Sequence, residues 1–131
     1  MDKKICVIGA GRWGKNHIKT LHELHCLAGI VETKESVCDE LKKQYPRITY
    51  FKNYRNAAND HFDGFVVTTP AETHFSIASY LLKKRKHVLV EKPLASSVDH
   101  GAELVNYAKE KKLQLMCDHT YCYTGAVRTI K

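Results

Sequence analysis

A glycine-rich turn near the start of the chain constrains the fold more than any other feature. The strand-like run at residues 3–8, which is apolar from Ile5 onward, leads directly into Gly9-Ala10-Gly11-Arg12-Trp13-Gly14, and a helical pattern follows. In this G-x-G-x-x-G arrangement Gly9 allows a tight turn, Gly11 lets the backbone come close to a pyrophosphate, and Gly14 lets helix and strand pack closely. The third glycine is expected to open a helix whose free N–H groups point at the anion. The pattern predicts a dinucleotide-binding turn.

An acidic residue follows at the spacing that such a turn requires. A second apolar run, residues 27–31, ends at Glu32, about 20 positions beyond the glycines, where a carboxylate can accept hydrogen bonds from the adenosine ribose. A carboxylate here repels a 2′-phosphate, so NAD is predicted in preference to NADP, although Lys34 is close enough to weaken this preference. The alternative interpretation of Glu32 is a solvated residue at a strand end.

Strand and helix patterns alternate along the rest of the chain. Apolar, β-branched runs predict strands at residues 3–8, 27–31, 48–51, 64–68, 87–90 and 113–117. Helices are expected at 14–25, 34–45, 72–84 and 97–111, the last capped by Ser97, with a short turn-rich piece at 53–60. This alternation predicts an α/β fold, a doubly wound parallel sheet of about six strands with helices on both faces, as in the Rossmann dinucleotide-binding fold.

Length and cysteine usage indicate one cytoplasmic domain. The 131 residues can bury a real core, and no apolar run is long enough to span a membrane. Only four apolar residues follow the first four residues of the chain, which argues against a signal peptide. The five cysteines are an odd number without a paired framework, as expected of reduced thiols. Cys6 is expected to be a small core residue.

The net charge of +7 raises the question of nucleic-acid binding. The basic residues are spread over the predicted helix ends, at 42–43, 83–86 and 109–112, where cations complement the helix dipole. Solvated helix ends are therefore favoured over a nucleic-acid surface. The charge can also help to attract an anionic ligand such as a nucleotide sugar.

No metal site is predicted. His22 and His25 are three residues apart instead of the four of H-E-x-x-H, and no third ligand accompanies them. Cys117, Asp118 and His119 could each bind a metal, but they follow the predicted sixth strand in a region better suited to substrate contacts.

Three motifs together resemble the Gfo/Idh/MocA family of NAD(P)-dependent oxidoreductases. They are the G-x-G-x-W-G turn, the T-P-x-x-x-H element of Thr69, Pro70 and His74, and the E-K-P element of residues 91–93, in matching order and spacing. The resemblance extends from residue 3 to about residue 128. Within the family the chain looks most like dehydrogenases that act on sugars or nucleotide sugars.

The resemblance implies a role for each motif. Lys92 would be the catalytic lysine, whose ammonium hydrogen-bonds the substrate alcohol and stabilises the alkoxide as hydride leaves. Glu91 would bond the nicotinamide ribose, and Pro93 would fix the loop through a cis peptide. Thr68, Thr69 and Pro70 would line the cofactor channel.

Other residues keep two interpretations. His74 is expected to begin a helix, with or without a cofactor contact. Trp13 is either a packing residue or a lid over the cofactor, and Arg12 either pairs with phosphate or faces solvent. His119 and Tyr121 are candidates for substrate-side contacts.

The family has a second domain that supplies most of the substrate pocket. Residues 1–118 are predicted to form the Rossmann domain, and residues 119–131 to begin the segment that crosses to that second domain, which this sequence lacks. Lys92 would then face solvent, and uncovered apolar surface would favour homo-oligomers. The first hypothesis is the NAD-binding domain of a sugar or nucleotide-sugar dehydrogenase. The alternative is a non-catalytic NAD-binding or interaction module.

Overall fold

Six parallel strands form one sheet in the computed structural model, which describes residues 2–130. The strands lie in the order β3-β2-β1-β4-β5-β6. Their bounds are β1 Ile5–Ile8, β2 Leu27–Val31, β3 Thr49–Phe51, β4 Gly64–Val67, β5 His87–Glu91 and β6 Leu115–Asp118. The chain order reverses direction between β1 and β4, so ligands are expected at the carboxyl ends of these two strands. The predicted doubly wound fold is confirmed.

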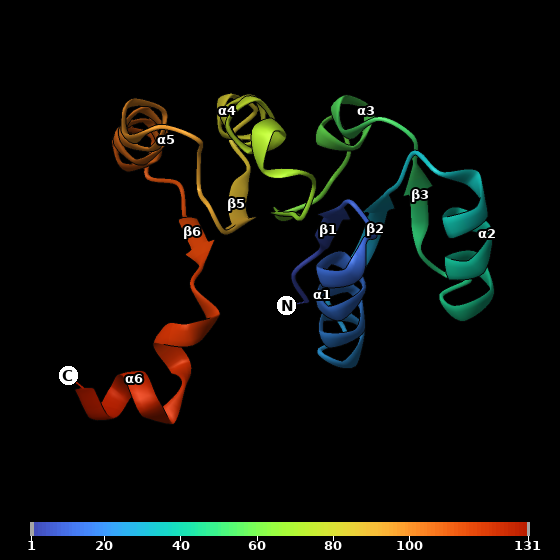
Figure 1. The fold of residues 1–131 in the computed structure, drawn as a ribbon. Helices are drawn as coiled ribbons and strands as arrows, with labels where there is room; N and C mark the ends of the chain where they lie inside the picture. Colours follow the sequence, from blue (N-terminus) through green and yellow to red (C-terminus); the bar gives the residue numbers. More distant parts are fainter. Residues whose placement is uncertain (1, 131) are drawn as a thin grey trace.

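Helices cover both faces of the sheet. Their bounds are α1 Arg12–Glu23, α2 Glu35–Gln44, α3 Tyr54–Ala58, α4 His74–Lys83, α5 Val98–Glu110 and α6 Gly125–Ile130, with short 3₁₀ turns at Ala71–Thr73 and Thr120–Tyr123. Helices α1 and α2 lie on one face and α3, α4 and α5 on the other, while α6 extends away from the sheet beyond β6 (Figure 1).

The core consists of two apolar clusters separated by the sheet. Val7 of β1 belongs to the cluster with Ile18 of α1 and Leu41 of α2. Its neighbours in β1, Cys6 and Ile8, belong to the cluster beneath α4 and α5. Successive strand residues thus point to opposite buried faces, which explains the continuous apolar runs in the sequence. Cys6 is fully buried in this cluster, so its predicted core role is confirmed. Burial, with a smaller contribution from Asp60, raises the pKa of its thiol.

Two local predictions need correction. Helix α1 begins at Arg12 and not at Gly14, because Gly11 is already the extended N-cap residue. Residues 53–60 are not merely turn-rich, because they contain helix α3. The Asn53 side chain caps this helix by accepting a hydrogen bond from the Arg55 backbone N–H at 2.8 Å. The predicted cap of α5 is confirmed, since Ser97 Oγ accepts from the His100 N–H at 3.2 Å.

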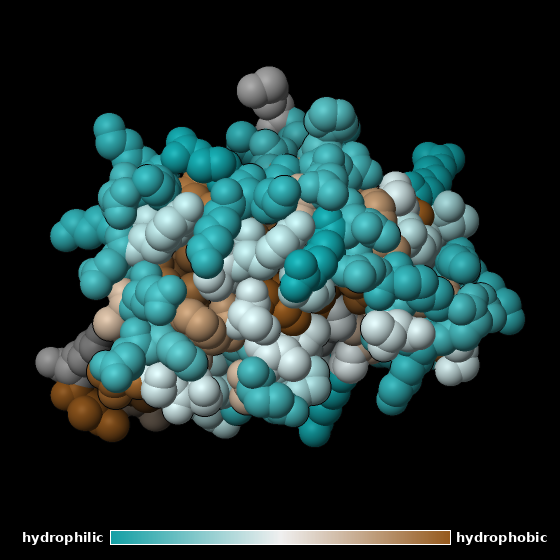
Figure 2. Space-filling model, turned by 90° about the horizontal axis from the view of Figure 1, so that it is seen from above, coloured by the Kyte–Doolittle hydropathy of each residue, from teal (hydrophilic) through white to brown (hydrophobic). Residues whose placement is uncertain are grey.

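The distribution of basic residues on the surface agrees with the predicted solvated helix ends. Basic residues occupy the last turns of α2, α4 and α5, as predicted. The face over α3, α4 and α5 is mostly hydrophilic (Figure 2). Among residues 2–130, no helix is both long enough and apolar enough to cross a membrane.

Three helices end in the same strained way. His25, Arg85 and Lys112 follow α1, α4 and α5, and each adopts a positive φ, of 57°, 63° and 56° respectively. This left-handed conformation ends a helix by satisfying its last carbonyls, and glycine adopts it with the least strain. Each of these three helix ends is therefore strained, and substitution of the residue by glycine would relieve the strain.

Lys112→Gly is expected to stabilise the protein by about 0.5–1 kcal/mol, because Lys112 is exposed and its side chain strains this backbone. The exposed Lys109 lies inside α5 and is the matched control, since Lys109→Gly should destabilise by about 1 kcal/mol. Urea unfolding of the three proteins measures both effects. Equal losses of stability in the two variants would contradict the assignment of strain to residue 112.

Candidate functional site

A cavity of about 820 Å³ opens at the carboxyl ends of β1, β2 and β4. Its walls come from four segments of the chain, which are residues 8–13, 31–34, 52–54 and 68–70, with a few further side chains. These segments include the glycine turn, the end of β2 and the end of β4, as a doubly wound sheet requires of a ligand site. The cavity is therefore at the position predicted from the sequence.

The glycine turn is built around one very close approach. Gly9 has a φ of +94°, a conformation that suits glycine. A Cβ on Gly14 would lie 2.1 Å from the Gly9 carbonyl oxygen, so helix α1 can pack on the turn only with glycine at that position. A Cβ on Gly11 would meet no protein atom within 4 Å. Gly9 and Gly14 thus serve the fold, whereas Gly11 borders open space in the cavity.

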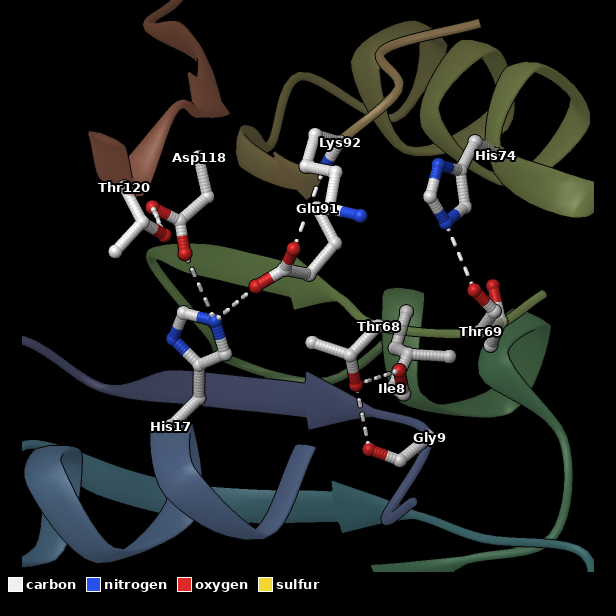
Figure 3. Close-up of polar contacts among 10 residues, drawn as sticks. All are labelled: Ile8, Gly9, His17, Thr68, Thr69, His74, Glu91, Lys92, Asp118 and Thr120. Carbon is white, nitrogen blue, oxygen red and sulfur yellow. Dashed lines mark hydrogen bonds and ion pairs between the residues drawn. The ribbon is translucent and has the colours of Figure 1, made fainter. Parts of the chain in front are cut away.

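Thr68 holds the turn from the neighbouring strand. Its Oγ1 lies 2.7 Å from the carbonyl oxygen of Gly9 and 3.0 Å from that of Ile8, and its single proton serves these two acceptors (Figure 3). Its backbone N–H also donates to Ile8 at 2.9 Å. Thr68 lines the cavity as predicted, and it also positions the glycine turn, a role that its place in the sequence does not reveal.

Glu32 is fixed at the wall of the cavity beside the glycine turn. Its Oε2 accepts from the Ala10 N–H at 3.0 Å, and its Oε1 accepts from the Lys34 N–H at 2.9 Å. Partial burial raises the pKa of this carboxyl, but hydrogen bonds from Lys34, Ala10 and Thr33 outweigh burial and hold the pKa below its usual value. Glu32 is therefore an oriented carboxylate with lone pairs left to accept from a ligand.

His74 joins the two loops at the other end of the site. It begins α4 as predicted and is 1% exposed. Its Nε2 lies 2.8 Å from the Thr69 carbonyl oxygen, and its Nδ1 lies 2.7 Å from the Pro93 carbonyl oxygen. Because carbonyl oxygens only accept, each bond needs a proton on the ring nitrogen. His74 thus ties the end of β4 to the loop that carries Lys92, and its cofactor contact stays a prediction.

The E-K-P loop follows β5. Lys92 is exposed, as expected, and the Lys92–Pro93 peptide is cis. Glu91 is 7% exposed, and its carboxylate contacts the imidazole of His17 from α1. That imidazole also contacts Asp118 at the end of β6. The sequence did not single out His17, although it lies three residues after Gly14 and so on the same face of α1. It pointed to Asp118 only as a possible metal ligand beside Cys117 and His119.

The predicted site residues divide into three groups. Those in the cavity wall are Gly9, Gly11, Arg12, Trp13, Glu32, Thr68, Thr69 and Pro70. Gly14, His74, Glu91 and Lys92 do not contribute to the cavity wall. His119 and Tyr121 are exposed beyond β6. The ligand contacts of all these residues stay predictions, but Trp13 lies half exposed at the cavity and not in the core.

Within the described residues, His17, Glu91 and Asp118 form the one group that could hold a metal ion. Their ligand atoms lie within 4.8 Å of one another. In this structure the imidazole contacts both carboxylates directly. The absence of a metal site stays a prediction.

Comparisons with known proteins agree with the geometry. Residues 3–119 match the model of the Gfo/Idh/MocA family, described as an oxidoreductase family with an NAD-binding Rossmann fold. A glucose-6-phosphate 3-dehydrogenase of Bacillus subtilis is 27% identical over 98% of this chain and 37% of its own length. A scyllo-inositol 2-dehydrogenase (NADP(+)) of the same species is 26% identical over 98% of this chain and 36% of its own.

A solved structure shares the same architecture. GenD2 from gentamicin A biosynthesis, in complex with NAD, superposes with a TM-score of 0.89 and 28% identity. The match covers 98% of this chain and 38% of GenD2. The chain thus spans less than half the length of the proteins it resembles.

Substitution of the two glycines separates folding from ligand binding. Gly14→Ala should destabilise the protein by about 3 kcal/mol, because the added methyl collides with the Gly9 carbonyl. Gly11→Ala should leave stability within about 0.5 kcal/mol of the wild type and weaken NAD binding at least about tenfold, or about 1.4 kcal/mol. Urea unfolding and calorimetric NAD titration measure the two effects. Gly101→Ala, another position with open space, is the control for binding. Undiminished NAD binding by Gly11→Ala would contradict a pyrophosphate contact at Gly11.

The Glu32 hydrogen bonds predict a pH dependence of stability. The folded-state pKa of Glu32 lies below the unfolded value of 4.5. The ionised carboxylate therefore makes its full contribution to the free energy of unfolding above pH 4.5. This contribution is lost as the pH falls through the folded pKa. The gap in unfolding free energy between wild type and Glu32→Gln should be widest at neutral pH and should narrow in acid. Urea unfolding across this pH range measures the gap, with the exposed Glu23→Gln as control. A gap that does not change with pH would contradict the argument.

Proposed function

Because the chain belongs to the Gfo/Idh/MocA oxidoreductase family, we propose that its cavity binds NAD and that it is the cofactor-binding part of a sugar or nucleotide-sugar dehydrogenase. One observation carries the proposal. The open backbone at Gly11 and the oriented carboxylate of Glu32 border the same cavity, so one dinucleotide could contact both.

The cavity residues fit the parts of a dinucleotide. Gly11 and the N-terminus of α1 would hold the pyrophosphate, because the first N–H groups of the helix are free to donate. Glu32 would accept from the adenosine ribose. Thr69 and Pro70 would border the nicotinamide half, near the loop of Lys92.

The proposed chemistry needs a polar group beside the reacting alcohol. A nicotinamide held at this site would supply the hydride donor or acceptor for the secondary alcohol carbon. In the reducing direction the Lys92 ammonium would donate a hydrogen bond to the carbonyl oxygen, stabilise the negative charge that develops there and then give up its proton to form the alcohol. In the oxidising direction the neutral Lys92 amine would take up that proton. Glu91 would bond the nicotinamide ribose in addition to its contacts within the protein. The named relatives support a sugar substrate, and the positive charge of the chain suits an anionic one such as a nucleotide sugar.

The surrounding architecture is part of the proposal. Residues 1–118 would form the cofactor domain, and residues 119–131 would begin a segment that crosses to a substrate domain, where His119 and Tyr121 would contact substrate. Homo-oligomers are supported by exposed apolar side chains that include Tyr121, Tyr123 and Ile130. A cytoplasmic location is supported by five free cysteines. The non-catalytic module is not favoured, since the chain retains the E-K-P element and its named relatives include dehydrogenases.

Calorimetric titration of the chain with NAD and with NADP tests the cofactor. NAD should bind about tenfold or more tightly than NADP, because the Glu32 carboxylate repels the 2′-phosphate. Glu32→Ser should lose most of this discrimination, and Glu23→Gln at the far end of α1 should retain it. Equal or tighter binding of NADP would contradict the cofactor assignment, and binding of neither would contradict the proposed function.

A further inference from the structure

A clasp of three polar side chains lies outside the cavity, between α1 and the ends of β5 and β6. His17 Nε2 is 3.0 Å from Glu91 Oε1 and 3.3 Å from Asp118 Oδ2 (Figure 3). The three side chains are 19%, 9% and 19% exposed, so solvent screens these contacts only weakly. Three elements that are distant in the sequence meet at one imidazole nitrogen.

The two carboxylates of the clasp determine which ring nitrogen of His17 carries a proton. Ionised carboxylates only accept hydrogen bonds, so His17 must carry its proton on Nε2 and share that proton between Glu91 and Asp118. Negative charge is in excess here. Burial raises the pKa of the adjacent Cys117 thiol, and the charges of Asp118 and Glu91 raise it further, against one backbone hydrogen bond that lowers it. The shared proton therefore holds together two carboxylates that would otherwise repel each other.

Glu91 transmits the position of α1 to the next residue. Its Oε1 contacts His17, and its Oε2 accepts from the backbone N–H of Lys92 at 3.3 Å. With both oxygens engaged, the carboxylate cannot turn without breaking one of the two contacts. The far side of the same loop is fixed independently, where His74 contacts the Pro93 carbonyl oxygen at 2.7 Å. The loop is thus held at both ends by histidines from different helices.

We propose that His17 is a positioning residue for the nicotinamide half of the site, acting through Glu91 to set where Lys92 stands. This inference rests on the proposed function. One face of helix α1 then contributes two residues that act at different parts of the site. Gly14 brings the helix onto the pyrophosphate turn, and His17, one turn later, fixes the loop at the other end of the dinucleotide. Asp118 keeps the imidazole in place by accepting from the same N–H.

A comparison of NAD with ADP tests the proposal, because ADP reaches the glycine turn and Glu32 but lacks both the nicotinamide and the ribose that carries it. Wild type should bind NAD more tightly than ADP. His17→Leu should weaken NAD binding about tenfold and leave ADP binding unchanged. His17→Gln should retain most of the NAD affinity, since its amide N–H can donate to Glu91. His22→Leu on the same helix is the matched control, because His22 packs on Tyr45 and not on the loop.

A second readout does not need a ligand. The amide proton signal of Lys92 in the ¹H–¹⁵N spectrum should shift in His17→Leu and stay near its wild-type position in His17→Gln and His22→Leu. Equal weakening of NAD and ADP binding in His17→Leu, an unshifted Lys92 signal, or equal wild-type affinity for the two ligands would each overturn the positioning role. If wild type binds neither ligand, the proposed function itself fails, and the role of His17 in it fails as well.

Discussion

The contact between Gly14 and the Gly9 carbonyl is the constraint on which the site depends. It brings the first turn of α1 against the end of β1, at a distance that excludes any side chain at position 14. Thr68 completes the contact from β4, since its hydroxyl reaches the same carbonyl at 2.7 Å. The switch between β1 and β4 is therefore one packed and hydrogen-bonded unit, and the cavity opens directly above it.

The two ends of the site are built by different means. At the glycine turn the contacts are made mainly by backbone groups, and the backbone N–H groups of Ala10 and Lys34 orient Glu32. At the Lys92 loop, side chains from α1 and α4 contact Glu91 and Pro93. Lys92 is exposed between these anchors, so its backbone is fixed while its ammonium is free to meet a substrate.

The sequence was informative wherever local chemistry dictates structure. The glycine spacing predicted the turn, the apolar runs predicted every strand, and Ser97 predicted a cap. Helix α3 was not predicted because its five residues are too few to repeat the helical period of about 3.6 residues. Its stability depends on the Asn53 cap and on packing of Tyr54 against Tyr80. The partners of His17 and His74 escaped for another reason. His17 contacts Glu91, 74 positions away, and His74 contacts Pro93, and both partners are brought close by the order of the strands.

Chemical-shift mapping during a titration with NAD tests the central claim most directly. If the cavity is a dinucleotide site, the amide signals that move should belong to the glycine turn, to residues 31–34 and to residues 68–70, with smaller changes at the Lys92 loop. Signals that move instead at the basic ends of α2, α4 and α5, or that do not move at all, would contradict the account.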